Sequence, residues 1–288
     1  MSEQRSSDHG AVAQQGQGQH GFALLIVLWV LVLIAFLVAQ ITTSGRTELR
    51  IASNIYDNAA AEAAVEGAIN EAVFHLSDPD PDRAWQADDG RRELVIGRSR
   101  VELRIDNEAA RVNPNFASPE LVQGLLLATG SSAENSQHLA LAIANWVGVP
   151  VPGSTPAAAA AQYRAGGLDY APPGQPMESL DELRRVIGMT PDIFAALRPH
   201  LTIYGPPVPD PQTPDPVVAA ALAFVARQHG GSLAAAMIAS RRGGLVTVRI
   251  TAIAHGPNNA ETARVAVVRL GASLPQRAVI LAWGASLD

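Results

Sequence analysis

The sequence contains no cysteine and no lysine, and only 5% of its residues are aromatic. Without cysteine there is neither a disulfide framework nor thiol chemistry, although an exported protein can do without both. All 21 basic residues are arginine, and 27 acidic residues outnumber them to give a net charge of −6. Because an acidic surface repels phosphate, we expect no nucleic-acid partner.

The common motifs of catalysis are also missing. The sequence has no G-x-S-x-G, no P-loop, no H-E-x-x-H and no G-x-G-x-x-G after a predicted strand. Its seven histidines are scattered, without the spacing of metal ligands. Because no convergent set of polar groups can be assembled from the sequence, we predict that the protein is not an enzyme and needs no cofactor.

A long apolar run lies near the start of the chain, in the stretch QHGFALLIVLWVLVLIAFLVAQ. From Phe22 to Ala39 it has no charged residue, and as a helix it would be about 27 Å long. The core of a bilayer is about 30 Å thick, so the run predicts a membrane span. A conventional signal peptide has a basic start and a shorter apolar run, whereas here Arg5 is offset by Glu3 and Asp8.

The chain is expected to continue from this run as one long helix. Apart from Gly45 and Gly67, no helix-breaking residue occurs before Asp78-Pro79. Apolar residues recur as on one helical face: Ile51 and Ile55 are four positions apart, and Val65, Ile69, Val73 and Leu76 are four, four and three apart. Residues 22–76 would form a rod of about 80 Å, in which residues 59–64 are a segment of small side chains.

Alternation of apolar and polar residues predicts an antiparallel sheet. Residues 94–105 alternate on both sides of Gly97-Arg98, as in a β-hairpin. Three more alternating runs close the chain at residues 245–255, 261–270 and 277–284. We expect these one-sided strands to cover the apolar stripe of the long helix.

A helical block is expected between the two groups of strands. Ser118-Pro119-Glu120 and Thr190-Pro191-Asp192 each place a capping residue before a proline at the first helical position. Residues 179–182 form a capping box. Residues 147–167, rich in proline, glycine and alanine, are expected to form a loop, and the proline-rich residues 205–216 a rigid linker before a further helix.

Together these elements predict an α+β fold, in which a long N-terminal membrane and amphipathic helix packs on a small antiparallel β-sheet and an all-α domain is inserted. The expected parts are an N-terminal segment at 1–21, which the resemblance described next identifies as a cytoplasmic leader, the N-terminal helix at 22–77 with its membrane span at 22–39, the first part of the sheet at 78–115, the helical insert at 116–201, and the linker, a helix and the remaining strands at 202–288.

Four segments carry a resemblance to a known family. They are GFALLIVLWVLVLIAFLVAQ, RTELRIASNIYDNAAAEAAVEGAI, RVNPNFASPELVQGLL and ESLDELRRVIGMTPDIFAALRPHLTIYG, which extend with gaps from about Gly21 to Gly205. In this order they resemble the type IV pilin-like superfamily and, within it, the K-class minor pseudopilins of type II secretion systems (GspK-like). The resemblance implies a subunit at the tip of the periplasmic pseudopilus, which nucleates or caps the assembly.

The resemblance also implies how the N-terminus is processed. In the family a prepilin peptidase cuts at the position of Gly21 and Phe22, and the new N-terminal residue, here Phe22, is methylated. The apolar helix stays in the bacterial inner membrane as a single pass, with the N-terminus cytoplasmic and the C-terminal part periplasmic. The partners implied are the peptidase, the other minor pseudopilins of the system and the proteins that it secretes.

Two features of the long helix bear on assembly. The fifth residue after the cut is Ile26, where the major pilins carry a glutamate that pairs with the subunit above. An unpaired carboxylate is costly in a bilayer, so Ile26 is consistent with a tip subunit. Partner helices are expected against Ala60 and Ala64, where small side chains allow close approach. The alternative is that these alanines lie under the protein's own sheet.

An acidic turn follows the long helix. Asp78, Asp80, Asp82 and Asp89 have a spacing that resembles the calcium loop of an EF-hand. Arg83 stands where such a loop has its glycine, so a solvated turn without calcium is the alternative.

A different function is suggested by SLDELRRVIGMTPDIFAALRPHL, which resembles a helix-hairpin-helix, a motif that binds DNA phosphates at a helix N-terminus. The alternative function is therefore a pilin-like component of a DNA-uptake or type IV pilus machine. Asp181, Glu182 and Asp192 lie where phosphate would bind, which favours a compact protein-binding cap instead.

Overall fold

The computed structural model describes residues 18–80, 82–88, 90–229, 245–271, 273–274 and 277–285. The chain divides into two compact units, Met1–Tyr56 and Asp57–Asp288, which we describe separately. Helix α1 (Gly18–Leu76) contains 59 residues and contributes to both units, because it includes residues on both sides of the boundary between Tyr56 and Asp57. Its N-terminal part contains the apolar segment, and its C-terminal part packs within the second unit.

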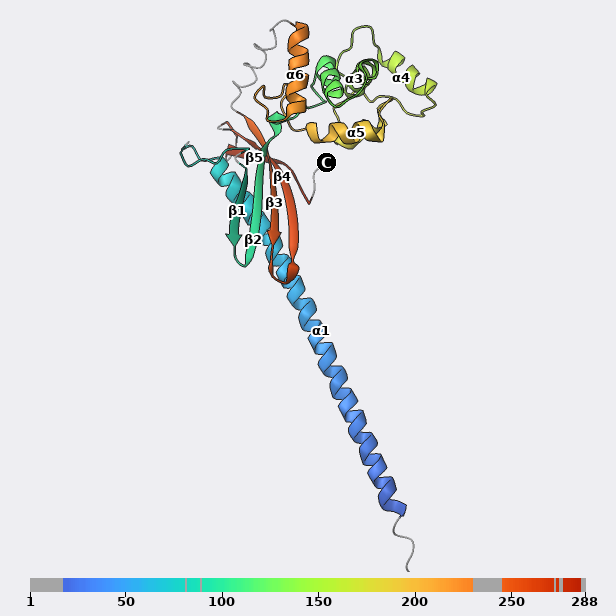
Figure 1. Ribbon diagram of the computed structural model, residues 1–288, viewed down its shortest axis with the longest axis vertical. Helices are drawn as coiled ribbons and strands as arrows, with labels where there is room; N and C mark the ends of the chain where they lie inside the picture. The colour runs from blue at the N-terminus through green and yellow to red at the C-terminus, as the bar shows by residue number, and fades with distance from the viewer. Residues whose placement is uncertain are drawn as a thin grey trace, which may run out of the picture. The chain divides into compact units, whose positions relative to one another are not determined.

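A five-stranded sheet forms one part of the second unit, with the strand order β1-β2-β3-β4-β5 (Figure 1). The strands are β1 (Arg91–Ile96), β2 (Ser99–Asn107), β3 (Val246–His255), β4 (Glu261–Leu270) and β5 (Ala278–Gly284). Every neighbouring pair is antiparallel, so the sheet is a meander. The predicted α+β fold and its antiparallel strands are therefore confirmed.

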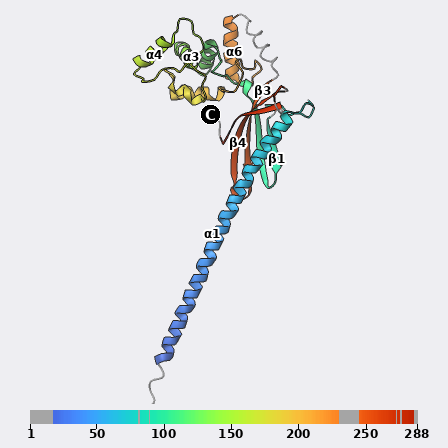
Figure 2. The ribbon, with the colours of Figure 1, turned by 180° about the vertical axis from the view of Figure 1, so that it is seen from behind.

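The C-terminal part of α1 covers one face of this sheet (Figure 2). The register places Leu103 opposite Ala252 and Ile250 opposite Ala266, so alternate residues of β2, β3 and β4 point toward the helix. Val65 and Ile69 of α1 are fully buried against them. The sheet core comprises Ala61, Ala64, Val65, Ala68, Ile69, Ala72, Val101, Leu103, Ile105, Val248, Ile250, Ala252, Ala254, Ala260, Ala266, Val268 and Leu270.

The other part of the second unit is helical. Its elements are η1 (Glu108–Ala110), α2 (Pro119–Ala128), α3 (Ala133–Val147), α4 (Pro156–Ala165), η2 (Leu180–Arg185), α5 (Pro191–Leu197), η3 (Arg198–His200) and α6 (Pro216–His229). A further short turn, η4 (Pro257–Asn259), joins β3 to β4.

The helix starts follow from local sequence signals. The side chains of Ser118, Ser132, Thr155 and Thr190 each accept a hydrogen bond from the backbone N–H of the third residue of the helix that follows. The expected capping box forms between Ser179 and Glu182, although it opens a 3-10 helix. The prediction of a loop over residues 147–167 was wrong, because α4 lies there. Its Thr155-Pro156 start and run of alanines carry the same cap and the best helix-forming residue.

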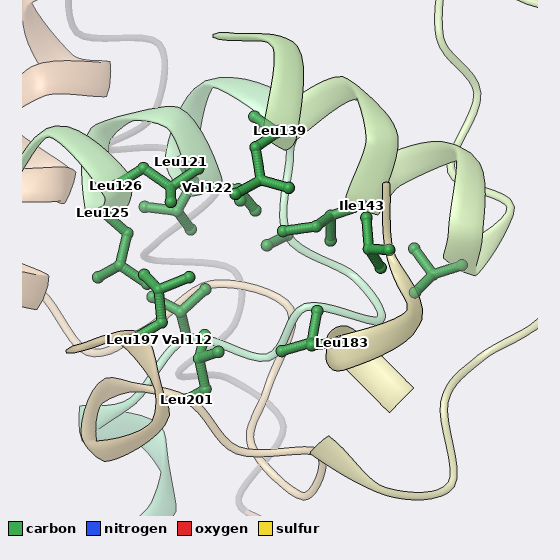
Figure 3. Close-up of a cluster of buried hydrophobic side chains, with 14 of the residues drawn as sticks. Val112, Leu121, Val122, Leu125, Leu126, Leu139, Ile143, Leu183, Leu197 and Leu201 are labelled. Carbon is green, nitrogen blue, oxygen red and sulfur yellow. The ribbon is translucent and has the colours of Figure 1, made fainter. Parts of the chain in front are cut away.

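The helical part has a hydrophobic core of its own, shown in Figure 3, where Leu125, Leu139 and Leu183 from three different elements converge. This core includes Val218, Ala221, Leu222 and Val225 of α6. The helical domain therefore extends beyond the expected boundary at residue 201. Gly124 of α2 permits this packing, since a Cβ there would lie 3.0 Å from the carbonyl oxygen of Ala221 in α6.

Candidate functional site

The apolar segment of α1 is the first candidate functional region. Phe22–Gln40 has a mean hydropathy of 3.3 and none of it is buried. Phe22 and Trp29 are each 68% exposed, and Ile26 is 49% exposed. In the part of the chain that the structure describes, this is the one helix long and apolar enough to cross a membrane. Gly21 and Phe22, the expected cleavage position, lie within α1.

The inner face of α1 packs on the sheet. Ala64 is only 2% exposed and lies in the sheet core between Ala61 and Ala68, while Ala60 is half-buried. The prediction that Ala64 contacts a partner helix is therefore wrong, and the alternative of burial beneath the protein's own sheet holds for this residue. At about 100° per residue, Ala64 shares the face of Ala61 and Ala68.

The opposite side of α1 is exposed within the second unit. Ala59, Ala63, Asn70 and Phe74 are all exposed, and Phe74 has 67% of its surface accessible. Their spacings of four, seven and four residues place them on one face, which we call the outer face. The exposed Glu66, three residues after Ala63, lies on the same face. The small side chains of Ala59 and Ala63 would let another helix approach closely at that end of the outer face.

Asp57 of α1 is an almost fully buried carboxylate, only 2% exposed, and it contacts two turns of the sheet. The side-chain amide of Asn258, in the turn between β3 and β4, donates to its Oδ2 at 2.6 Å. A guanidinium nitrogen of Arg98, in the turn between β1 and β2, lies 3.8 Å from its Oδ1. These contacts fix the register of the helix against the sheet.

Glu108 joins the sheet to the helical domain. It is fully buried, and its Oε1 accepts hydrogen bonds from Nε of Arg249 at 2.6 Å and from the Arg111 guanidinium at 3.1 Å. The hydroxyl of Thr202 donates to Oε2. Glu108 follows β2 on the way into the helical domain, and Thr202 follows η3 at the start of the connection to α6, so one carboxylate holds both connections.

Two asparagines of the RVNPNF stretch secure the same junction. The amide of Asn113 donates to the carbonyl oxygens of Ile203 at 3.2 Å and Gly205 at 2.8 Å. Asn115 donates to the carbonyl oxygen of Met177 at 3.0 Å and accepts from its N–H at 2.7 Å. These side chains therefore serve the chain's own backbone, which explains a polar motif beside a buried core.

The acidic turn after α1 uses its carboxylates internally. Asp78 accepts from the backbone N–H of Asp80 at 3.0 Å, and Asp80 accepts from that of Asp82 at 3.1 Å. Asp78 also lies 3.9 Å from Nε of Arg83. Among the residues that the structure describes, no three metal-binding side chains form a group, and Asp89 lies outside them. A calcium site here stays a prediction.

The region that resembles a helix-hairpin-helix consists of the 3-10 helix η2 and the seven-residue helix α5. Asp192 occupies the first turn of α5, and Asp181 and Glu182 occupy that of η2. Glu182 accepts from the backbone N–H groups of Glu178 and Ser179, and Trp146 Nε1 lies 3.4 Å from its other oxygen. Hydroxyl groups of Thr190 and Ser179 already cap these two helices, and carboxylates lie in both first turns, so no argument for phosphate binding follows.

Residues 101–207 match the sequence family described as "Type II secretion system (T2SS), protein K". The matched segment contains Glu108, Asn113, Asn115 and the greater part of the helical domain. This part of the chain is therefore similar to the K proteins of type II secretion systems.

The fold of the whole chain is similar to that of a chain in "The Crystal Structure of the GspK-GspI-GspJ complex from enterotoxigenic Escherichia coli Type 2 Secretion System". The two are 15% identical with a TM-score of 0.53, and the match covers 83% of this chain and 98% of the other. At this identity the likeness establishes the fold. No curated relative matches the sequence.

Proposed function

We propose that this GspK-like chain is anchored in the bacterial inner membrane by residues 22–39 and joins other minor pseudopilins at the tip of a periplasmic pseudopilus. A prepilin peptidase first cuts between Gly21 and Phe22, and Phe22 becomes the methylated N-terminus. The outer face of α1 is the observation that carries the proposal. Because the inner face is occupied by the chain's own sheet, the small side chains of the outer face are available to partner helices.

Two further features support the tip position. Ile26 replaces a carboxylate that would otherwise require a partner inside the bilayer. The helical domain adds a second hydrophobic core to the pilin-like sheet, and a terminal subunit can carry such bulk without blocking a neighbour above it. In the similar crystal structure GspK forms a complex with GspI and GspJ, and we propose equivalent partners for this chain.

Adjacent alanines on α1 provide a matched test of the interface. Ala63→Leu lies on the outer face and should leave the melting temperature unchanged, yet prevent co-purification of the full-length protein with the other minor pseudopilins of its system. Ala64→Leu inserts the same side chain into the core, where overpacking costs about 1–3 kcal/mol. Since 1 kcal/mol shifts the melting temperature of a domain of this size by about 2–4 °C, Ala64→Leu should melt about 2–12 °C lower.

The result for Ala63→Leu decides whether partner pseudopilins bind the outer face of α1. Normal assembly by a stably folded Ala63→Leu variant would show that partners do not use the outer face. A fall in its melting temperature like that of Ala64→Leu would show instead that the outer face belongs to the fold.

Processing is tested separately at the cleavage position. Mass spectrometry of the protein extracted from membranes should find methylated Phe22 at the N-terminus. Gly21→Val should keep the intact leader, because a side chain at this position obstructs the close approach of the peptidase to the backbone. If wild-type protein keeps Met1 or Ser2, or begins after residue 39, the prepilin interpretation is wrong.

A further inference from the structure

The two edges of the sheet differ in charge. Edge strand β1 contains Arg91, Arg92 and Glu93, and two of these form cross-strand ion pairs, Arg91 with Glu102 and Glu93 with Arg100. Charged side chains are a common protection of an edge strand against pairing with another chain. Edge strand β5, Ala278–Gly284, contains neither a charged residue nor a proline.

The unprotected edge also exposes apolar side chains. Ile280 is 51% exposed, and Val279 and Trp283 are each 38% exposed. Among the described residues β5 pairs only with β4, so the hydrogen-bonding groups along its outer edge have no strand beside them. An uncharged, apolar edge of this kind is a template for a further strand.

An irregularity in β5 brings the side chains of Ile280 and Trp283 to the same face. Ile280 pairs with Val268 and Trp283 with Ala266, and both of these β4 residues lie in the core under α1. The pairing skips Leu281, which allows residues three positions apart to point to one side. Their exposure shows that α1 does not cover this margin of the sheet.

We propose that the outer edge of β5 pairs with β5 of a second copy of this chain, in an antiparallel arrangement about a two-fold axis. The strand is complementary to itself, because its lack of charge avoids repulsion between identical side chains. With the axis between Leu281 and Ala282, Ile280 of each copy lies opposite Trp283 of the other. An aliphatic side chain and an aromatic ring are thus paired twice on one face.

This pairing forms a small interface. One strand of seven residues buries less than a standard interface of about 1,600 Å², so the dimer is weak in dilute solution. Confinement of both copies by the proposed membrane anchor raises their effective concentration and favours the dimer. The dimer is separate from the assembly through the outer face of α1, which involves other residues.

Absence of cysteine from the natural chain allows a clean cross-linking test. Two full-length variants, Leu281→Cys and Ala282→Cys, are purified with different tags, reconstituted together into phospholipid vesicles and oxidised. Directly opposed residues of antiparallel strands have Cβ atoms about 4.5–5.5 Å apart, near the separation that a disulfide requires. The mixed disulfide dimer is expected in excess over either homodimer. Val95→Cys on β1, where Val95 is 76% exposed, is the matched control and should cross-link only at the level of random collision.

A second experiment introduces a charge into β5. Ile280→Lys added to both cysteine variants should abolish the mixed dimer, whereas Val95→Lys should leave it unchanged. Equal cross-linking by Val95→Cys, or persistence of the dimer with Ile280→Lys, would overturn the proposal. If cross-linking at β5 occurs only with a partner pseudopilin, the edge binds that protein and the second-copy proposal fails.

Discussion

Glu108 offers the most direct test of how the helical domain is attached to the sheet. Replacement by alanine removes a fully buried carboxylate from between the guanidinium groups of Arg111 and Arg249. It also removes the acceptor of the buried Thr202 hydroxyl. The positively charged guanidinium groups of Arg111 and Arg249 then lose the carboxylate between them. The buried volume of the Glu108 side chain is lost as well.

The expected cost follows from the burial of the three groups. Loss of one partner of a buried ion pair costs about 3–5 kcal/mol. The side chains of Arg111 and Arg249 are 23% and 14% exposed, so water screens part of the loss and the lower end, about 3 kcal/mol, is expected. For a domain of this size that corresponds to a melting temperature about 6–12 °C lower. Glu108→Gln keeps the shape and one acceptor oxygen, so it should fall between Glu108→Ala and wild type.

Differential scanning calorimetry of the full-length protein in detergent measures the shift, and hydrogen exchange locates it. The backbone bonds from Val112 N–H to His200 and from Thr202 N–H to Val112 should exchange faster in both Glu108 variants. Asp181→Asn is the control, since the Asp181 and Arg184 side chains are 49% and 56% exposed and such a pair contributes about 0–1 kcal/mol. If Glu108→Ala melts like Asp181→Asn, the carboxylate does not hold the two connections together.

Two further predictions concern the helical domain. Gly148 and Gly153 both have φ of +77°, but a Cβ at Gly148 would lie 2.5 Å from the carbonyl oxygen of Gly174, while nothing lies within 4 Å at Gly153. Gly153→Ala should therefore cost only the backbone strain of about 1–2 kcal/mol, and Gly148→Ala clearly more; equal melting temperatures would contradict the close approach. Burial raises the pKa of Tyr163 above the ordinary value of 10.0. The unfolded chain then loses this proton at lower pH than the folded protein, so the stabilisation is complete below pH 10 and is lost as the pH rises above it. Tyr163→Phe should make the fall of melting temperature above about pH 10 less steep, and an unchanged slope would refute the assignment.

Local signals in the sequence predicted most of the secondary structure. Strands β3 and β4 were expected at residues 245–255 and 261–270 and lie at Val246–His255 and Glu261–Leu270. Ser118 and Thr190 cap their helices as expected. These features succeed because alternation and capping depend on a few adjacent residues.

Contacts between distant segments could not be predicted in this way. Thr202 and Arg249 bind Glu108 from 94 and 141 residues along the chain. No periodicity connects such positions, and a buried glutamate after a strand resembles any exposed one in sequence. Helix α4 was missed for a different reason, because the prolines and glycines beside it outweighed its own capping signal.

The alanines of α1 show why its functional face is hard to predict from sequence. A helix that packs a sheet on one side and partner helices on the other needs small side chains on both, so the usual contrast between apolar and polar faces disappears. Ala61, Ala64 and Ala68 are buried in the sheet core, while Ala59 and Ala63 remain exposed. Residue type alone cannot separate these two groups, but the direction of each side chain can. Enlargement of an inner alanine should therefore damage the fold, and enlargement of an outer one should damage only assembly.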